Sequence, residues 1–268
     1  MRLTVLGCCG GIGGGRETTA FLLNDRVLID AGTGVSRLTS AQMQDIEHVL
    51  LTHAHMDHIA ALPMLVDARH DPYVNGQAAP VAVHACDATL ETLQTHIFNW
   101  AVWPDFSRLP HVQAPVLRWQ ALRAGQHVHL CDLNFEVVGV NHPPDGVGFI
   151  VSADDAVVAF SGDTTSNSHL WARLNARDRL DYLVVECAFP DASEALARAS
   201  HHYCPRLLAQ DLRQLRHRPR LGLTHFKPQY AETIRQECAQ WLPDWRWEVL
   251  QPGQVMDFEP RQSELLVA

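Results

Sequence analysis

The stretch that decides the fold is His53-Ala54-His55-Met56-Asp57-His58. It directly follows the apolar run Val49–Thr52, which is typical of a β-strand, and it leads into a segment with helical spacing. Side chains two residues apart on an extended segment point to the same side, so the first two histidines can bind one cation. The aspartate and the third histidine lie at the turn into the helix, where they can reach a second cation. Because such a pattern is rare by chance, we predict a two-metal site at the end of this strand.

Three more residues of metal-binding type each come just after a predicted strand: His142, Asp163 and His225. Side chains at the ends of several strands can converge on one place, so these three complete the set that a two-metal site needs. All the donors are nitrogen or oxygen atoms. Such a set suits Zn2+, but also Mn2+ or Fe, because no soft ligand is present to select among them.

This order of motifs resembles the metallo-β-lactamase-fold hydrolases, and the resemblance covers nearly the whole chain. Leu28-Ile29-Asp30-Ala31-Gly32 is similar to the early strand motif of that family. The resemblance implies an α/β fold, the four-layer αββα sandwich, with the site along one edge of the two sheets. It also implies two divalent metal ions, one bound by His53, His55 and His142, the other by Asp57, His58 and His225, with Asp163 bridging them.

Later motifs resemble the phosphodiesterase branch of this superfamily, which includes the tRNA 3′-end endonucleases and the class II cyclic-nucleotide phosphodiesterases. These motifs are Glu186-Cys187-Ala188-Phe189, His202-Tyr203-Cys204-Pro205 and Thr224-His225-Phe226-Lys227-Pro228. The segment 97–106 is most similar to the cyclic-nucleotide enzymes, whereas His-Tyr-Cys-Pro departs from the His-Ser-Thr motif of the endonucleases. The resemblance therefore predicts hydrolysis of a small phosphodiester, such as a 3′,5′-cyclic nucleotide.

Three residues are candidates for a direct part in the reaction. We expect a metal-bound hydroxide to attack phosphorus, since a bound cation lowers the pKa of water to roughly 7. Asp57 would help to position this hydroxide. His202 would donate a hydrogen bond or a proton to the phosphate or the leaving group, and Glu186 would hold its orientation. His201 is an equal chemical candidate, and only the motif favours its neighbour.

The composition narrows the class of protein and its partners. The chain has 268 residues, a net charge of −9, and 16 histidines against 21 lysines and arginines. The acidic balance makes nucleic acid an improbable partner, and no apolar run reaches the roughly 18 residues of a membrane-spanning helix. Seven widely spread cysteines without a C-x-x-C motif argue against a disulfide framework and predict a cytoplasmic enzyme. A homodimer remains an open alternative.

Strands and helices alternate in both halves of the chain, which predicts one hydrolase domain over residues 1–268. Aromatic residues and prolines interrupt this pattern around 97–115, and we expect an insertion there that shapes the substrate site. We also expect a helix over 39–47 with Ser40 as its N-cap, and the residues 57–69 have helical spacing. The glycine loop Gly10–Gly15 lacks the Lys-Ser/Thr pair of a phosphate-binding loop, so it predicts a turn near the site.

Other functions remain possible on such a scaffold. A thioesterase, a lactonase or a β-lactamase could share the metal site, because fold alone does not select the reaction. A tRNA 3′-processing endonuclease is a further alternative. From a different class, a di-iron redox protein would favour a carboxylate in place of His55 and would need a flavin domain, for which the chain has no room. A metal-binding protein without catalysis is disfavoured, because no expected ligand is missing.

Overall fold

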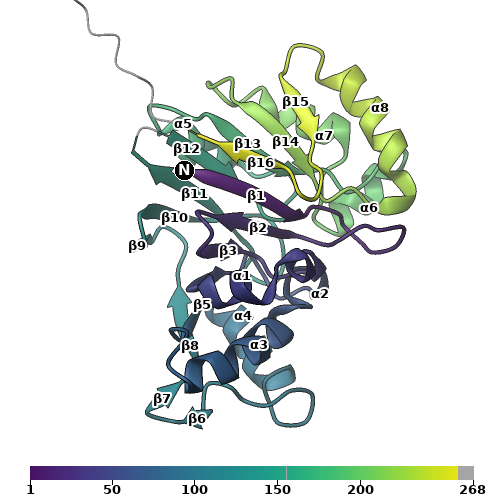
Figure 1. Cartoon of the computed structure of the whole chain (residues 1–268). Coiled ribbons are helices and arrows are strands. Elements are labelled where there is room, and N and C mark those ends of the chain that lie inside the picture. Colours follow the sequence, from purple (N-terminus) through teal and green to yellow (C-terminus); the bar gives the residue numbers. More distant parts are fainter. Residues whose placement is uncertain (155, 259–268) are drawn as a thin grey trace, which may run out of the picture.

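The computed structural model describes residues 1–154 and 156–258 and shows two β-sheets stacked face to face, with helices on both outer sides (Figure 1). This is the four-layer αββα sandwich that the resemblance implied, and the prediction is confirmed. In spatial order, the first sheet consists of β16 (Val255–Asp257), β1 (Arg2–Gly7), β2 (Ala20–Leu23), β3 (Val27–Ile29), β4 (His48–Leu50), β5 (Val81–Cys86) and β8 (Leu117–Leu122).

The second sheet also has seven strands, and it mixes an antiparallel with a parallel part. Its strands in spatial order are β15 (Trp247–Val249), β14 (Arg220–Thr224), β13 (Tyr182–Glu186), β12 (Ala156–Phe160), β11 (Val147–Ala153), β10 (Leu133–Gly139) and β9 (His127–Leu130). Strands β12 to β15 run parallel, as do β3, β4, β5 and β8 of the first sheet. The carboxyl ends of parallel strands therefore meet at one edge of each sheet.

Apolar side chains from both sheets fill the space between them. Phe21 of β2 and Phe160 of β12 meet there with ring centroids 5.5 Å apart, and Val27 and Phe149 belong to the same buried cluster. Alternation along the strands gives each sheet this inner face and an outer face for helices. The two stacked sheets thus bring their strand ends close together along a shared edge.

Helices bury the outer faces of both sheets. The first sheet is flanked by α1 (Ser40–Asp45), α2 (Met56–Ile59), α3 (Leu62–Val74) and α4 (Asp87–His96), and the second by α5 (Ser168–Asn175), α6 (Glu194–Ala199), α7 (Pro205–Leu212) and α8 (Ala231–Trp241). Short 3-10 turns lie at η1 (Thr33–Arg37), η2 (Asp191–Ser193) and η3 (Pro228–Tyr230). None of the helices in the described part of the chain has the length and apolar character needed to cross a bilayer.

One local prediction is wrong, and a second lacked detail. The N-cap of α1 is Thr39 and not Ser40: the Thr39 hydroxyl accepts a hydrogen bond from the Gln42 amide, and the Gln42 side chain accepts one from the Thr39 amide. The helical spacing predicted over 57–69 is confirmed, but it is divided between two helices, α2 and α3. Between α2 and α3 the backbone amide of Ala61 donates to the carbonyl of Ala31 in a neighbouring segment, at 2.9 Å, instead of continuing the helix.

The segment 97–115 packs chiefly on the first half of the molecule. Phe98 and Phe106 are buried in the core under α3 and α4, and the Tyr73 hydroxyl donates to the carbonyl of Ala114 at 3.1 Å. The segment ends in the short hairpin of β6 (Pro110–His111) and β7 (Ala114–Pro115), at the bottom of Figure 1. Trp100 is exposed on its surface. A role in shaping the substrate site stays a prediction, as does the single-domain organisation.

The glycine loop between β1 and β2 starts directly against a predicted metal ligand. A side-chain carbon added at Gly10 would lie 2.5 Å from the carbonyl oxygen of His225, so only glycine permits this approach. The Lys227 ammonium group donates to the Gly10 carbonyl at 2.9 Å and holds the base of the loop. Gly13, by contrast, has a positive φ and open space around it.

Candidate active site

Seven side chains that the sequence singled out gather at the shared edge of the two sheets. The first sheet contributes the loop after β4, and the second sheet contributes the segments after β10, β12 and β14. Within each group of donors, the ligand atoms lie within 4.8 Å of one another. The residues brought together are His53, His55, Asp57, His58, His142, Asp163 and His225.

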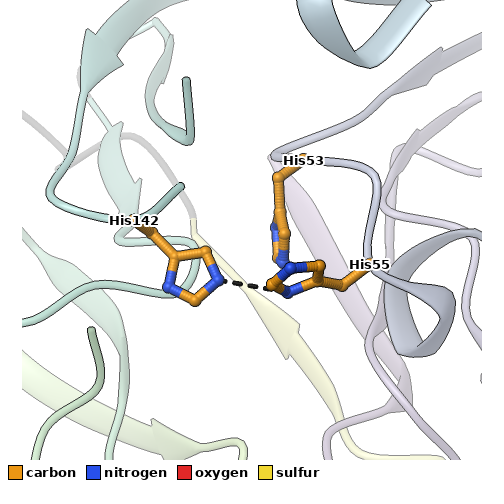
Figure 2. A group of neighbouring side chains, drawn as sticks. All are labelled: His53, His55 and His142. Atoms are coloured by element: carbon orange, nitrogen blue, oxygen red, sulfur yellow. Dashed lines mark hydrogen bonds between the residues drawn. The ribbon is translucent and has the colours of Figure 1, made fainter. Parts of the chain in front are cut away.

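Three histidines form the first group of donors (Figure 2). Nε2 of His142 lies 3.2 Å from Nδ1 of His55, and the ring of His53 stands 4.5 Å from that of His55. Nδ1 of His142 is 2.9 Å from the carbonyl oxygen of His201. Because a carbonyl oxygen only accepts, Nδ1 of His142 must carry the hydrogen, and this leaves the lone pair of Nε2 for an ion.

Asp57, His58 and His225 form the second group. Nε2 of His225 lies 3.6 Å from Oδ2 of Asp57. Nδ1 of His58 is 2.7 Å from Oδ2 of Asp30, a buried carboxylate at the end of β3. Because a carboxylate oxygen only accepts, Nδ1 of His58 carries the hydrogen. The lone pair of Nε2 is then left for an ion.

Asp163 lies between the two groups. Its Oδ2 atom is 3.2 Å from Nε2 of His58, 3.3 Å from Nε2 of His225 and 3.7 Å from Nε2 of His53. The carboxylate is 3% exposed, so water does not compensate its charge. Although burial alone would raise the pKa of Asp163, His225 and His58 hold it well below its usual range.

The buried ring nitrogens of this site fit metal ions. Nε2 of His53, of His58 and of His225 has no hydrogen-bond partner among the described residues, although each atom is buried. A buried polar atom without a partner destabilises a fold by about 1–3 kcal/mol, which an ion bound between these nitrogens would offset. Burial lowers the pKa of His142 to about 4 and that of His225 to about 3, so both rings present the neutral form that binds metals.

His202 and Glu186 form a buried pair beside the donors. Nδ1 of His202 lies 2.7 Å from Oε1 of Glu186, which also accepts a hydrogen bond from the Thr164 amide at 3.0 Å. The His202 ring stacks on that of His225 at 5.4 Å between centroids and 16° between planes. Although burial opposes it, Glu186 raises the pKa of His202. The pair thus places a polarised imidazole next to the centre.

His201 takes a different position from its neighbour. It is half-buried, its φ is 57°, and Nδ1 lies 2.9 Å from Oδ1 of Asn141. One ring nitrogen of His202 belongs to a donor group with His142 and Asp163, and no group of donors found in the described chain includes His201. Through its carbonyl, His201 instead orients His142.

Two residues that position the donors received no role in the sequence analysis. Asp30 accepts hydrogen bonds from the Thr52 amide at 2.8 Å and from the Thr52 hydroxyl at 2.9 Å, besides its contact with His58. Asp30 follows β3 and Thr52 follows β4, and these two strands pair in parallel. Asp30 belongs to the early strand motif of the sequence, but its contact with His58 depends on the pairing of β3 with β4, which the motif alone does not predict.

Replacement of this orienting carboxylate tests its part in the site. We expect Asp30→Asn to lower metal affinity by about 10–100-fold, because the amide no longer stabilises the tautomer of His58. Competition with a chromogenic chelator would measure the change. Thr39→Ala removes a helix cap that contacts none of the seven donors and serves as a control, for which metal affinity should stay constant. An Asp30→Asn variant with wild-type affinity would contradict this role.

Comparison with known proteins places the chain in a family. A family model described as "Beta-lactamase superfamily domain" matches residues 25–226, and this range includes all seven donor residues. The chain belongs to this family. It is a hydrolase of the metallo-β-lactamase superfamily, and the family together with the donor groups indicates divalent metal binding.

Individual relatives are distant but span most of the chain. A "Probable 3′,5′-cyclic-nucleotide phosphodiesterase" of Yersinia pestis is 23% identical over 86% of this chain and 79% of its own length. A "3′,5′-cyclic-nucleotide phosphodiesterase" of Schizosaccharomyces pombe is 24% identical over 63% of this chain, but only about half (51%) of its own length is matched. The crystal structure of unliganded yeast PDE1 is 16% identical, with a TM-score of 0.78 over 95% of this chain and 98% of that one, which shows a shared fold.

Proposed function

We propose that this hydrolase is a two-metal phosphodiesterase that cleaves a small phosphodiester, with a 3′,5′-cyclic nucleotide as the substrate class. The observation that supports it best is the buried His202–Glu186 pair next to seven converging metal-type donors, because it supplies a proton donor beside a cation site. The names of the two distant phosphodiesterase relatives support the substrate class.

The ligand assignment is part of this proposal. His53, His55 and His142 would hold one ion, Asp57, His58 and His225 the other, and Asp163 would bridge them. Zinc is our preferred metal, because neutral imidazoles and carboxylates in a buried site suit it. When bound, such a pair of ions activates water near neutral pH and neutralises the charge of the non-bridging phosphate oxygens.

The side chains of the protein would orient the reactants and move one proton. Although burial opposes it, His58 and His225 lower the pKa of Asp57, which is therefore ionised at neutral pH and can accept a hydrogen bond from the attacking water. His202 keeps its Nδ1 hydrogen on Glu186. In its protonated form it would donate the Nε2 hydrogen to the leaving sugar oxygen as the P–O bond breaks.

The charge of the chain supports a small substrate rather than a polymer. A net charge of −9 would repel a long polyanion, whereas two dications would dominate the field at a single phosphodiester. We also place the enzyme in the cytoplasm, since none of its seven cysteines forms a disulfide. A homodimer stays a prediction.

A substrate panel tests the proposal directly. The enzyme loaded with Zn2+ is offered cyclic AMP and a chromogenic bis-aryl phosphodiester, and in parallel a thioester, a lactone and a precursor tRNA. We expect turnover of the two phosphodiesters to exceed that of the other compounds by about 10^2-fold or more, because His202 is placed to protonate an alkoxide leaving group. Turnover of the thioester alone would refute the phosphodiesterase assignment.

A further inference from the structure

A second group of metal-type side chains lies at the other end of β4 from the candidate active site. We name it the edge cluster, formed by Glu47, His48, His84 and Cys131. A carboxylate oxygen of Glu47, a ring nitrogen of His48 and the sulfur of Cys131 all lie within 4.8 Å of one another. These residue types differ from those of the active site, because a thiol stands among the donors.

Two strands and one turn contribute three of the side chains of the edge cluster. His48 begins β4, His84 lies on the neighbouring β5, and Cys131 lies in the turn between β9 and β10 of the opposite sheet. His84 pairs with Leu50, which lies two residues beyond His48, so the two histidines project from the same face of the first sheet. Leu50 belongs to the core between the sheets, and that face therefore points toward the second sheet.

A hydrogen bond anchors the cysteine turn to the first sheet. The side-chain amide of Asn24 donates to Oδ2 of Asp132 at 2.8 Å, and Asp132 follows Cys131 in the turn. Asn24 lies in the turn between β2 and β3, next to the start of β4 in the sheet order. This hydrogen bond holds the turn that carries Cys131 against the first sheet, near His48.

The two histidines are arranged as a metal ligand and its supporting partner. Nδ1 of His48 lies 3.1 Å from Nε2 of His84. Burial lowers the pKa of both rings, that of His84 to about 4, so both are neutral at neutral pH. When His48 donates its Nδ1 hydrogen to His84, the Nε2 lone pair of His48 is left for an ion. Metal-binding histidines are commonly oriented by such a second hydrogen bond.

The carboxylate and the thiol supply the negative charge of the edge cluster. Both contacts of the Arg26 guanidinium group with Glu47 fall on Oε1, and Oε2 accepts no hydrogen bond within the described ranges. Burial raises the pKa of the Cys131 thiol, so binding of a dication would release the thiol proton to solvent as the metal–sulfur bond forms. The thiolate and the carboxylate then supply two negative charges beside the ion, and Glu47 also keeps its ion pair with Arg26.

We propose that Glu47, His48 and Cys131 bind one divalent ion of the zinc class, with His84 orienting His48. The ion links the start of β4 in the first sheet to the β9–β10 turn of the second. A set of sulfur, nitrogen and oxygen donors selects zinc-like ions over Mg2+ or Ca2+. The three protein donors leave one tetrahedral position for water.

Cobalt substitution tests this site separately from the active site. The purified chain is stripped with a chelator and titrated with Co2+ while the near-ultraviolet spectrum is recorded. Only a thiolate ligand produces the sulfur-to-cobalt charge-transfer band there, and none of the active-site donors is a cysteine. We expect this band in the wild-type chain, with three ions bound per chain at saturation.

Matched variants assign the band. Cys131→Ser should abolish it and reduce the bound cobalt from three ions to two, and His48→Gln should weaken binding at this site by at least tenfold. Cys9→Ser, at a partly buried cysteine outside the edge cluster, should keep both the band and three ions. Asp163→Ala should keep the band while losing active-site cobalt. A wild-type chain without the band, or a band that survives Cys131→Ser, would overturn the proposal.

Discussion

Asp163→Ala is expected to lose bound metal and hydrolytic activity together. The Asp163 carboxylate lies 3.2–3.7 Å from three buried histidine nitrogens, and none of these forms a hydrogen bond within the described chain. Metals supply several kcal/mol of transition-state stabilisation, and each 1.4 kcal/mol is a factor of ten, so kcat/KM should fall by at least about 10^3-fold. Elemental analysis should find at most one ion per chain at the active site.

Two further variants separate the loss of a ligand from a loss of stability. Asp163→Asn keeps the volume of the side chain but weakens the donor, so it should also lose metal. Asp181→Asn changes another carboxylate, one that accepts a hydrogen bond from the Val157 amide at 2.9 Å, and its metal content should match the wild type. If Asp163→Ala retains both active-site ions, the bridging assignment is wrong.

His202→Ala is expected to lower kcat by about 10^2–10^4-fold while both ions stay bound, because removal of a general acid typically costs that factor. The side chain contacts Glu186 and the rings of two proposed ligands, but the substitution removes none of the seven proposed ligands. Steady-state kinetics with the chromogenic phosphodiester and elemental analysis of the same sample would show both effects.

The neighbouring histidine provides the matched control. His201→Ala removes a half-buried ring that belongs to no donor group and keeps the backbone carbonyl that orients His142, so kcat should change by less than about fivefold, as expected for a group outside the reaction. A larger loss for His201→Ala than for His202→Ala would reverse the assignment. Full activity of His202→Ala would remove the general acid from the mechanism.

The pH profile should change when the partner of His202 is altered. A general acid works in its protonated form, so kcat falls as pH rises through the pKa of His202. Glu186 raises that pKa, although burial opposes it. In Glu186→Gln the negative charge is lost, and the alkaline limb of the profile should shift to lower pH. An unchanged alkaline limb would show that another group controls it.

The local spacing of the first motif and the later strand ends was enough to predict that these metal-type side chains converge. Histidines two residues apart on an extended segment face the same way, and His142, Asp163 and His225 each follow a strand. What escaped prediction depends on distant pairing. The contact of Asp30 with His58 requires β3 and β4 to lie side by side, and no local pattern states which strands are neighbours.

Local ambiguity explains the smaller errors. Thr39 and Ser40 are both good N-cap residues, and the reciprocal bond with Gln42 decides between them. The strand β8 (Leu117–Leu122) lies at the edge of the first sheet and mixes polar and apolar side chains, so its local pattern does not define a strand. The edge cluster joins His48 to Cys131 across two sheets, and such a separation leaves no motif spacing to recognise.

The division of the donors between the two sheets has a consequence for metal binding when the protein is destabilised. His53, His55, Asp57 and His58 come from the first sheet, whereas His142, Asp163 and His225 come from the second. Neither half of the chain holds a complete site for either proposed ion. Metal affinity therefore measures how well the halves dock, and a change that loosens the contact between them should release metal well before the chain unfolds.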